Sequence, residues 1–106
     1  MITRSGEIPP RSMGEGLIRR NMCVGDRMML CRFTMKAGAR VPLHSHPHEQ
    51  TGYCISGSFE FTVGDTVTTV RAGDAWMVPG NTPHTADFHE DCELVEAFCP
   101  VREDYL

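Results

Sequence analysis

The chain has 106 residues, of which 41% are hydrophobic and 23% charged, and its formal net charge is −4 at pH 7. This length suits one compact domain that folds without disulfides, and the composition is that of an ordinary soluble globular protein. The acidic balance argues against a nucleic-acid partner, and we find neither a secretory signal pattern nor an apolar run long enough to span a bilayer. We therefore expect a cytoplasmic protein without a membrane or nucleic-acid partner.

Glycine and proline recur at short intervals, and no long segment has helical periodicity, so the predicted elements are strands. Residues 1–14 are expected to form an arm along the surface, and residues 15–106 the folded domain. Hydrophobic and polar side chains alternate along 29–35, and a hairpin with a Gly64-Asp65 turn is predicted to join 59–63 to 67–70. Two further short strands are expected at 75–78 and 92–99. Short strands at this spacing predict an all-β sandwich or barrel.

The five cysteines form no CxxC pair, which favours reduced thiols in the cytosol over a disulfide framework. Free cysteine usually behaves as a small buried hydrophobe, so we expect all five to be buried and assign none as a metal ligand or nucleophile. They are Cys23, Cys31, Cys54, Cys92 and Cys99.

Histidines are concentrated between residues 44 and 50. If this segment is a strand, every second side chain points to the same face, so His44, His46 and Gln50 can converge on one point. His84 follows a Pro-Gly-Asn turn on what is expected to be a neighbouring strand. Neutral imidazole is the commonest protein ligand for transition metals, and an amide oxygen can complete the set. The alternatives are a chance cluster and an exposed metal-scavenging tract.

The spacing around these residues resembles the two motifs of the cupin superfamily. In the first motif, G-x5-HxH-x3-E-x6-G, Gly38, His44, His46 and Gly57 fall in register, and Gln50 takes the glutamate position. In the second, G-x5-P-x-G-x2-H-x3-N, three positions match and two differ: Gly73, Pro79 and His84 match, whereas Asn81 and Phe88 replace glycine and asparagine. The resemblance implies a single-domain jelly-roll β-barrel that binds one divalent transition metal (Ni, Mn, Fe, Zn or Co). Its metal ligands would be His44, His46, Gln50 and His84.

Glutamine in place of glutamate leaves four uncharged ligands, so the metal would keep its full charge and attract an anionic substrate more strongly. Glu49 is the alternative ligand, but strand alternation points it away from His46, and Pro47 can disturb that alternation. His48 has no place in the motif and is interpreted as a neighbour of the ligands or a surface residue.

A narrower resemblance connects HSHPHEQ and the terminal F-x-P-x-REDYL to the cupins of pectin and alginate breakdown. Those proteins convert 4,5-unsaturated uronates into linear 5-keto-4-deoxyuronates, and the resemblance implies catalytic roles for Glu96, Phe98 and Arg102. The family usually has aspartate at the position of Glu96. On pattern alone, the opposite orientation of the last strand, with Val95 in the core and Glu96 in solvent, is favoured. A surface Arg102 paired with Glu103 or Asp104 is the corresponding alternative.

Three function classes therefore follow from the sequence. The first is a uronate-linearising isomerase or hydratase-like enzyme acting on a small anionic sugar acid. The second is a metal-dependent dioxygenase, which the absence of a carboxylate at position 50 disfavours. The third is a sugar- or metal-binding module without turnover. A homodimer is expected because open sheet edges are commonly covered by pairing, with residues 15–35 as the candidate contact.

Overall fold

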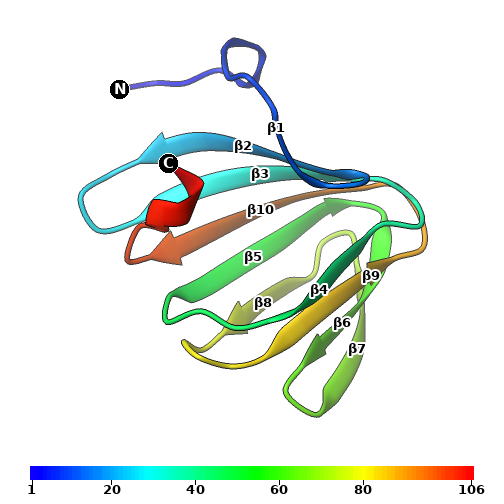
Figure 1. Ribbon diagram of the computed structural model, residues 1–106. Coiled ribbons are helices and arrows are strands. Elements are labelled where there is room, and N and C mark those ends of the chain that lie inside the picture. Colours follow the sequence, from blue (N-terminus) through cyan, green and yellow to red (C-terminus); the bar gives the residue numbers. More distant parts are fainter.

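The computed structural model describes all residues from 1 to 106, and its architecture is all-β (Figure 1). The strands are β1 (Arg11–Gly14), β2 (Leu17–Val24), β3 (Met29–Met35), β4 (Arg40–His44), β5 (Glu49–Ser56), β6 (Ser58–Val63), β7 (Thr66–Arg71), β8 (Ala75–Val78), β9 (His84–Phe88) and β10 (Cys92–Cys99). Two short 3-10 helices, η1 (Ser5–Glu7) and η2 (Glu103–Tyr105), lie near the chain ends. The all-β prediction is confirmed.

The strands form two antiparallel sheets that face each other. The six-stranded sheet has the order β1-β2-β3-β10-β5-β8, and the four-stranded sheet has the order β4-β9-β6-β7. No backbone ladder joins the edges of one sheet to those of the other, so the expected barrel has the form of two facing sheets, which is the layout of a double-sheet jelly roll. The chain crosses between the sheets at the β4–β5 connection, and this crossing carries part of the histidine cluster.

Most of the predicted strands coincide with observed ones. Residues 29–35, 75–78 and 92–99 are β3, β8 and β10, and the hairpin strands β6 and β7 are slightly longer than predicted. Gly64 in the hairpin turn has φ +58°, a left-handed conformation that glycine adopts without steric cost. Within the segment expected to be an arm, residues 11–14 form the edge strand β1, which pairs with β2.

The core lies between the two sheets and follows from strand alternation. In β3, Met29, Cys31, Phe33 and Met35 are buried while the residues between them are not. Each fully buried large apolar side chain contributes about 1.5–3 kcal/mol. Aromatic rings fill the centre, where the rings of Phe59 and Phe88 lie 4.8 Å apart. The core therefore fixes which face of each strand points toward the interior.

The cysteines are all free, but they divide into two groups. Cys31, Cys54 and Cys92 are buried, whereas Cys23 and Cys99 are exposed, so the expectation that all five are buried is wrong for these two. Cys23 lies near the end of β2, and Cys99 is the last residue of β10, where it follows Val95 and Ala97 on the outer face of the sheet. Burial raises the pKa of Cys31 and of Cys92 to about 11.

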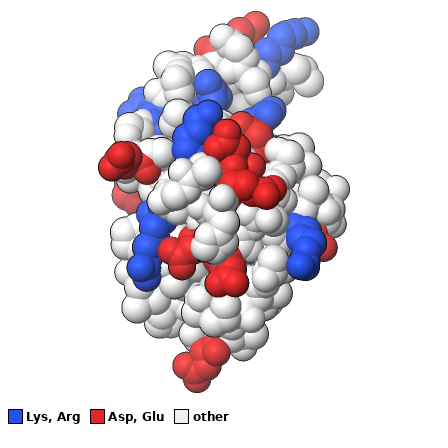
Figure 2. Space-filling view, turned by 90° about the vertical axis from the view of Figure 1, so that its right-hand side faces the viewer, with Lys and Arg blue, Asp and Glu red and all other residues white.

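Acidic and basic side chains are intermingled on the surface. Figure 2 shows one such face, where lysine, arginine, aspartate and glutamate lie among many uncharged residues without a broad patch of one sign. No helix of this protein has the length and apolar character needed to cross a membrane.

Candidate metal centre

Three histidines converge at the end of the cavity between the sheets. His44 is the last residue of β4 and His84 is the first of β9, and the two are direct partners in the ladder of these strands. Their ring centroids lie 4.2 Å apart, and the His46 ring lies 5.0 Å from that of His84. One ring nitrogen from each histidine lies within 4.8 Å of the other two, which is a distance at which three imidazoles can bind one ion.

The histidine segment is not one continuous strand. His44 ends β4 in the four-stranded sheet, Gln50 lies in β5 of the six-stranded sheet, and His46 lies in the connection between them. Strand alternation along 44–50 was therefore the wrong reason for their convergence. The residues meet because the chain folds over from one sheet to the other at this point.

The connection that carries His46 is held against the turn before His84. The Asn81 backbone N–H donates to the His46 carbonyl oxygen over 2.7 Å. Asn81 has φ +63°, which explains how it replaces the glycine of the second motif, because asparagine tolerates the left-handed conformation better than most residues. A Cβ on Gly80 would clash with the Pro47 carbonyl oxygen. The two segments that carry ligands are thus fixed relative to each other by backbone contacts.

Each of the three imidazoles has its Nδ1 atom bound to a main-chain carbonyl. The partners are the carbonyl oxygens of Pro42 for His44 at 2.8 Å, of His48 for His46 at 3.0 Å and of Thr82 for His84 at 2.7 Å. A carbonyl only accepts, so each Nδ1 carries the hydrogen and each Nε2 keeps a free lone pair.

The free lone pairs fit a metal ion. The Nε2 atoms of His46 and His84 are buried and have no hydrogen-bond partner, an arrangement that is costly unless a ligand satisfies them. Burial, followed by the charge of Arg102, lowers the pKa of His46 to about 4. Burial also lowers the pKa of His84, against the opposing effect of its bond to Thr82. Both rings are therefore neutral near pH 7, which is the form that binds metals.

Gln50 lies beside the histidines with its amide oriented by a carboxylate. Its side chain is buried, and its Nε2 donates to Glu96 Oε2 over 2.6 Å, which leaves the amide oxygen as the atom available to a metal. Glu49, the alternative ligand, is exposed. His48 is outside the cluster of three, but its carbonyl oxygen anchors His46 and its ring lies 5.4 Å from the His46 ring.

Glu96 faces the cavity and not the solvent. It lines the cavity together with Leu94 and Phe98 from the same face of β10, whereas Val95 lies on the outer face, so the orientation favoured by pattern alone is wrong. Its Oε2 accepts hydrogen bonds from Gln50 and, over 2.9 Å, from Trp76 Nε1. Burial raises the pKa of this carboxyl to about 7, although both hydrogen bonds and the charge of Arg102 act to lower it.

Trp76 is a site residue that the sequence analysis missed. Glu96, Gly52 and Trp76 are successive partners across β10, β5 and β8, and a Cβ on Gly52 would lie 2.2 Å from the Trp76 indole. Because Gly52 has no side chain, the indole lies across it and reaches the carboxylate. The signal was a lone tryptophan on the same strand face as Val78, but the pairing of the strands was needed to recognise its role.

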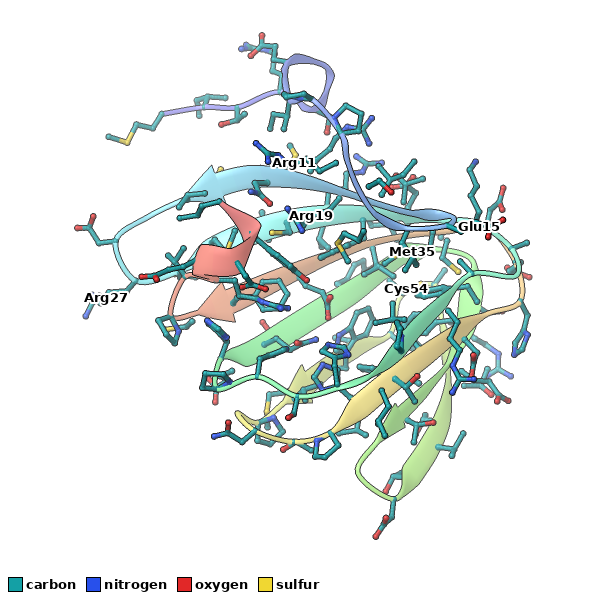
Figure 3. All side chains as sticks on the ribbon, in the orientation of Figure 1. Arg11, Glu15, Arg19, Arg27, Met35 and Cys54 are labelled. Carbon is teal, nitrogen blue, oxygen red and sulfur yellow. The ribbon has the colours of Figure 1, made fainter.

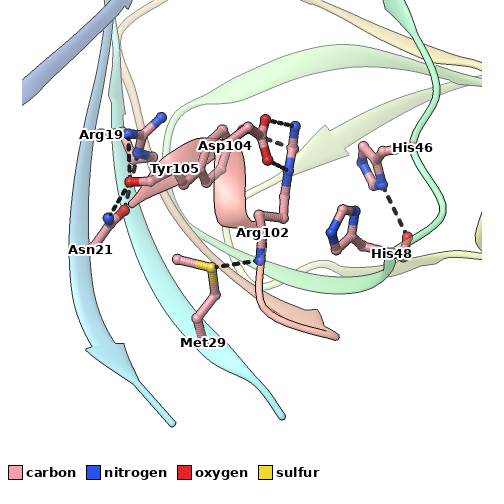
Figure 4. Close-up of polar contacts among 8 residues, drawn as sticks. All are labelled: Arg19, Asn21, Met29, His46, His48, Arg102, Asp104 and Tyr105. Carbon is pink, nitrogen blue, oxygen red and sulfur yellow. Dashed lines mark hydrogen bonds and ion pairs between the residues drawn. The ribbon is translucent and has the colours of Figure 1, made fainter. Parts of the chain in front are cut away.

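Arg102 and Phe98 lie at the side of the cavity near η2. Arg102 is 9% exposed and makes a two-point ion pair with Asp104, with Nη2 to Oδ2 at 2.9 Å and Nε to Oδ1 at 3.4 Å (Figure 4). The pairing matches the alternative considered for Arg102, but its position is buried and not on the surface. Its guanidinium carbon lies 5.2 Å from the centre of the Phe98 ring, and that ring lies 6.0 Å from the His46 ring.

One cavity connects these groups. Its inner space is about 50 Å³, enough for an ion and one or two water-sized groups. Histidine, amide, carboxyl and guanidinium groups line it together with an apolar wall of core residues; the polar lining residues include His44, Gln50, His84, Glu96 and Arg102. The predicted ligand and catalytic residues other than His46 thus line one cavity, and the His46 ring lies 5.0 Å from that of His84, which lines it.

Comparison with known proteins places this arrangement in a family. A family model described as a cupin domain matches residues 31–98, which include all three clustered histidines. The chain belongs to the cupin family. This cupin has only part of each motif in strands, since the ligands come from the ends of β4 and β9, the connection between β4 and β5, and β5.

Two solved cupin structures closely match the fold. A RmlC-like cupin from Shewanella frigidimarina has a TM-score of 0.95 and 27% identity, with 99% of this chain and 95% of that chain covered. KdgF from Halomonas sp. has a TM-score of 0.94 and 27% identity, with 100% and 98% covered. In sequence, the pectin degradation protein KdgF of Dickeya dadantii is 30% identical over 102 residues, which cover 94% of this cupin and 93% of that protein.

Proposed function

We propose that this cupin is a metal-dependent enzyme that opens 4,5-unsaturated uronates to linear 5-keto-4-deoxyuronates. The observation that carries the proposal is the shared cavity: neutral histidines with free Nε2 atoms lie beside a carboxyl whose pKa is near neutrality. The similarity over nearly the whole chain to a pectin degradation protein supports this substrate class.

The metal ligands in this proposal are His44, His46, His84 and Gln50. A divalent ion held by them would act as a Lewis acid that orients the oxygens of the sugar and polarises the one that leaves. All four ligands are uncharged, so the positive charge of the ion is not neutralised within its ligand set, which favours an anionic substrate.

Glu96 is the general acid and base of the proposed reaction. It gives its proton to the alkene carbon of the enol ether, and the water that adds to the neighbouring carbon returns a proton to the carboxylate. The hemiketal so formed then opens: its hydroxyl loses a proton and becomes the keto oxygen as the bond to the ring oxygen breaks, and the ring oxygen takes up a proton. A carboxyl with a pKa of about 7 is well matched to both roles at neutral pH, and such catalysis is typically worth ~10²–10⁴-fold in rate.

Trp76 and Gln50 determine which oxygen of Glu96 reacts. Both donate to Oε2, so that atom is held as an acceptor and Oε1 is the oxygen free to carry the proton. Trp76 also packs edge-on against Phe59, with ring centroids 5.5 Å apart, which limits movement of the indole. Trp76 is therefore a positioning residue.

Arg102 binds the substrate carboxylate. Asp104 occupies its Nε and one Nη2 hydrogen, and its Nη1 donates to the Tyr105 hydroxyl over 2.9 Å. One hydrogen on each terminal nitrogen remains, and these are the donors for the substrate carboxylate. The Phe98 ring, which lies beside both Arg102 and His46, forms the wall against the sugar face.

The test is the loss of ultraviolet absorbance of an unsaturated uronate monomer, with and without chelator. We expect acceleration over the spontaneous reaction that chelator removes and that Glu96→Gln reduces by at least about 100-fold. Glu93→Gln is the matched control, because Glu93 lies on the opposite face of β10 and contacts Arg32 and Thr34. No acceleration by the wild-type protein would overturn the proposal, and equal losses in both variants would remove the role of Glu96.

The homodimer remains a prediction. Within the segment 15–35, Leu30 is 39% exposed and lies in an apolar depression on the outer face of the six-stranded sheet, beside Val95 and Ala97. Light scattering of the wild-type protein and of Leu30→Glu tests this contact, and a wild-type monomer at high concentration contradicts it.

A further inference from the structure

An open pocket of about 690 Å³ adjoins the inner cavity on the side of β1, β2 and η2. It shares the wall residues His44, Arg102 and Tyr105 with that cavity, so the two spaces lie next to each other. This volume is within the range of small-ligand sites, whereas the inner cavity is far smaller. A sugar acid is too large for the inner cavity alone, so one that reaches the histidines would also occupy the outer pocket.

The outer pocket contains an excess of positive charge in a chain whose net charge is −4. Arg11, Arg19 and Arg102 line it, and Asp104 is the one carboxylate among its lining residues. Asp104 is already paired with Arg102. Arg11 and Arg19 form no ion pair with this chain. Two guanidinium charges in the pocket are thus without a protein counter-charge.

Arg19 is buried although its charge is not neutralised. It is 8% exposed, its Nε donates to Asn21 Oδ1 over 3.0 Å, and its Nη2 donates to the Tyr105 carbonyl oxygen over 3.2 Å (Figure 4). Nη1 has no hydrogen-bond partner in the chain, and it is not among the fully enclosed unpaired atoms. Arg19 lines the open pocket, so Nη1 is the donor of this side chain that is available to a ligand there, and a buried charge without a partner is costly.

Tyr105 lies between two of these charges. The guanidinium carbons of Arg19 and Arg102 lie 3.8 Å and 4.0 Å from the centre of its ring. Two planar groups this close to one ring centre overlap unless they stack on opposite faces, so the order is Arg19, Tyr105, Arg102. The line continues from Arg102 toward the histidines, as Figure 4 shows.

Arg11 adds a third charge opposite Arg19. The two residues are direct partners in the β1–β2 ladder, and Figure 3 places them on these neighbouring strands. Like charges directly opposite each other destabilise a strand pair. An anion bound in the pocket would remove this repulsion and also satisfy the free donors of Arg19.

The geometry points to a second anion subsite at Arg19, assisted by Arg11, that takes the distal carboxylate of a uronate disaccharide. The inference rests on the proposed function for the first sugar, whose carboxylate lies at Arg102 beside the metal centre. The second sugar then extends past the Tyr105 edge and presents its carboxylate to Arg19 Nη1. The chain would bind dimeric uronates more tightly than monomers.

Arg19 also has a structural contact, since it holds η2 through the Tyr105 carbonyl oxygen. If Arg19 had only this structural role, its replacement would lower the stability of the chain or reduce the affinities for the one-sugar and the two-sugar ligand by the same factor. The ratio of the two affinities is therefore the decisive quantity, because it changes only if Arg19 meets the second sugar.

Titration calorimetry on the metal-loaded full chain measures this ratio with galacturonate and digalacturonate, which lack the reactive double bond. We expect digalacturonate to bind at least about tenfold more tightly to the wild type, and the two ligands to bind Arg19→Gln equally. Arg20→Gln is the matched control, because Arg20 is the next residue on β2 and points to the opposite face. It should keep the preference.

Equal affinities in the wild type, or an equal loss of preference in Arg19→Gln and Arg20→Gln, would overturn the inference. If Arg19→Gln does not fold, Arg11→Gln takes its place, since Arg11 is exposed. Arg11→Gln should reduce the preference for digalacturonate about threefold. An unchanged preference in this variant contradicts the subsite. A second experiment repeats the titrations in the presence of inorganic phosphate as a competitor. If phosphate weakens the binding of both ligands equally, the only carboxylate site is at Arg102, and the subsite at Arg19 is contradicted.

Failure of the proposed function is separable from failure of this inference. Turnover of the unsaturated monomer by the wild type without a preference for digalacturonate overturns the subsite alone. A preference for digalacturonate without turnover supports the subsite and overturns the enzymatic proposal.

Discussion

Replacing Glu96 with glutamine removes a titrating group from the cavity while leaving the side-chain shape and an acceptor for Trp76 in place. In the folded chain, burial raises the pKa of this carboxyl to about 7, against 4.5 as its ordinary value. Between pH 4.5 and 7 the folded state therefore holds a proton that the unfolded state has released. Its contribution to the free energy of unfolding is fully present below pH 4.5 and is lost as the pH rises through 7.

The size of this loss follows from the two pKa values. Each pH unit in the window changes the free energy of unfolding by about 1.4 kcal/mol, so the whole contribution is about 3 kcal/mol. Relative to the wild type, Glu96→Gln should gain about this amount between pH 4.5 and pH 7.5. The comparison must be between variants, because His46 titrates in the opposite sense: its lowered pKa makes its own contribution rise with pH from about 4 to 6.5.

The assay is urea denaturation of chelator-treated protein, followed by tryptophan fluorescence at several pH values across this window. Glu93→Gln is the control, since it removes a carboxyl from the outer face of the same strand. Its free energy of unfolding should not increase relative to that of the wild type across this pH window. A difference between Glu96→Gln and the wild type that stays flat from pH 4.5 to 7.5 would refute the enclosed, proton-holding state of Glu96.

Three further predictions test other parts of the structure. A thiol reagent should modify two cysteines in the native chain, Cys23 and Cys99, and all five after denaturation, because the other three are buried; more than two fast-reacting thiols contradicts the core as described. Gly52→Ala should destabilise the chain by about 1–3 kcal/mol in thermal or urea unfolding, because its Cβ would overlap the Trp76 indole, and a neutral effect would mean that the indole lies elsewhere. His84→Ala should weaken metal binding more than about 100-fold in competition with a chromogenic chelator, and unchanged affinity would exclude it as a ligand.

Sequence patterns predicted the strands where one face is apolar and the other polar. The strand at 29–35 is an example, and its limits coincide with β3. The short run at 75–78 is apolar on both faces, and its limits coincide with β8 because Gly73 and Pro79 enclose it. The motif spacing identified the three clustered histidines, because glycine and proline positions fix the turns around them. The convergence of distant segments was therefore predictable from spacing, although the strand alternation invoked for 44–50 was not the cause.

The orientation of Glu96 could not be read from β10 alone. Both faces of this strand are largely apolar, since Leu94 and Phe98 face the core while Val95 and Ala97 lie on the outer face. The small apolar residues of one face favoured Val95 in the core and Glu96 in solvent, whereas the packing of the second sheet selects the opposite orientation.

Contacts that depend on which strands pair could likewise not be predicted from the sequence. Trp76 reaches Glu96 only because Gly52 stands between them in the sheet, and this follows from the order β10-β5-β8. The stacking of Arg19 and Arg102 on Tyr105 joins residues more than eighty positions apart. No local sequence pattern predicts such a contact.

The way the imidazoles are anchored affects how the chemistry of this chain can change. Their Nδ1 partners are backbone oxygens within two positions of each ring, so no exchange of a neighbouring side chain can delete them. Glu96, by contrast, is held by the side chains of Gln50 and Trp76, each of which a single codon change can replace. The orientation of the three imidazoles should consequently withstand mutational drift, while the position of Glu96 is open to change, in the laboratory or by selection.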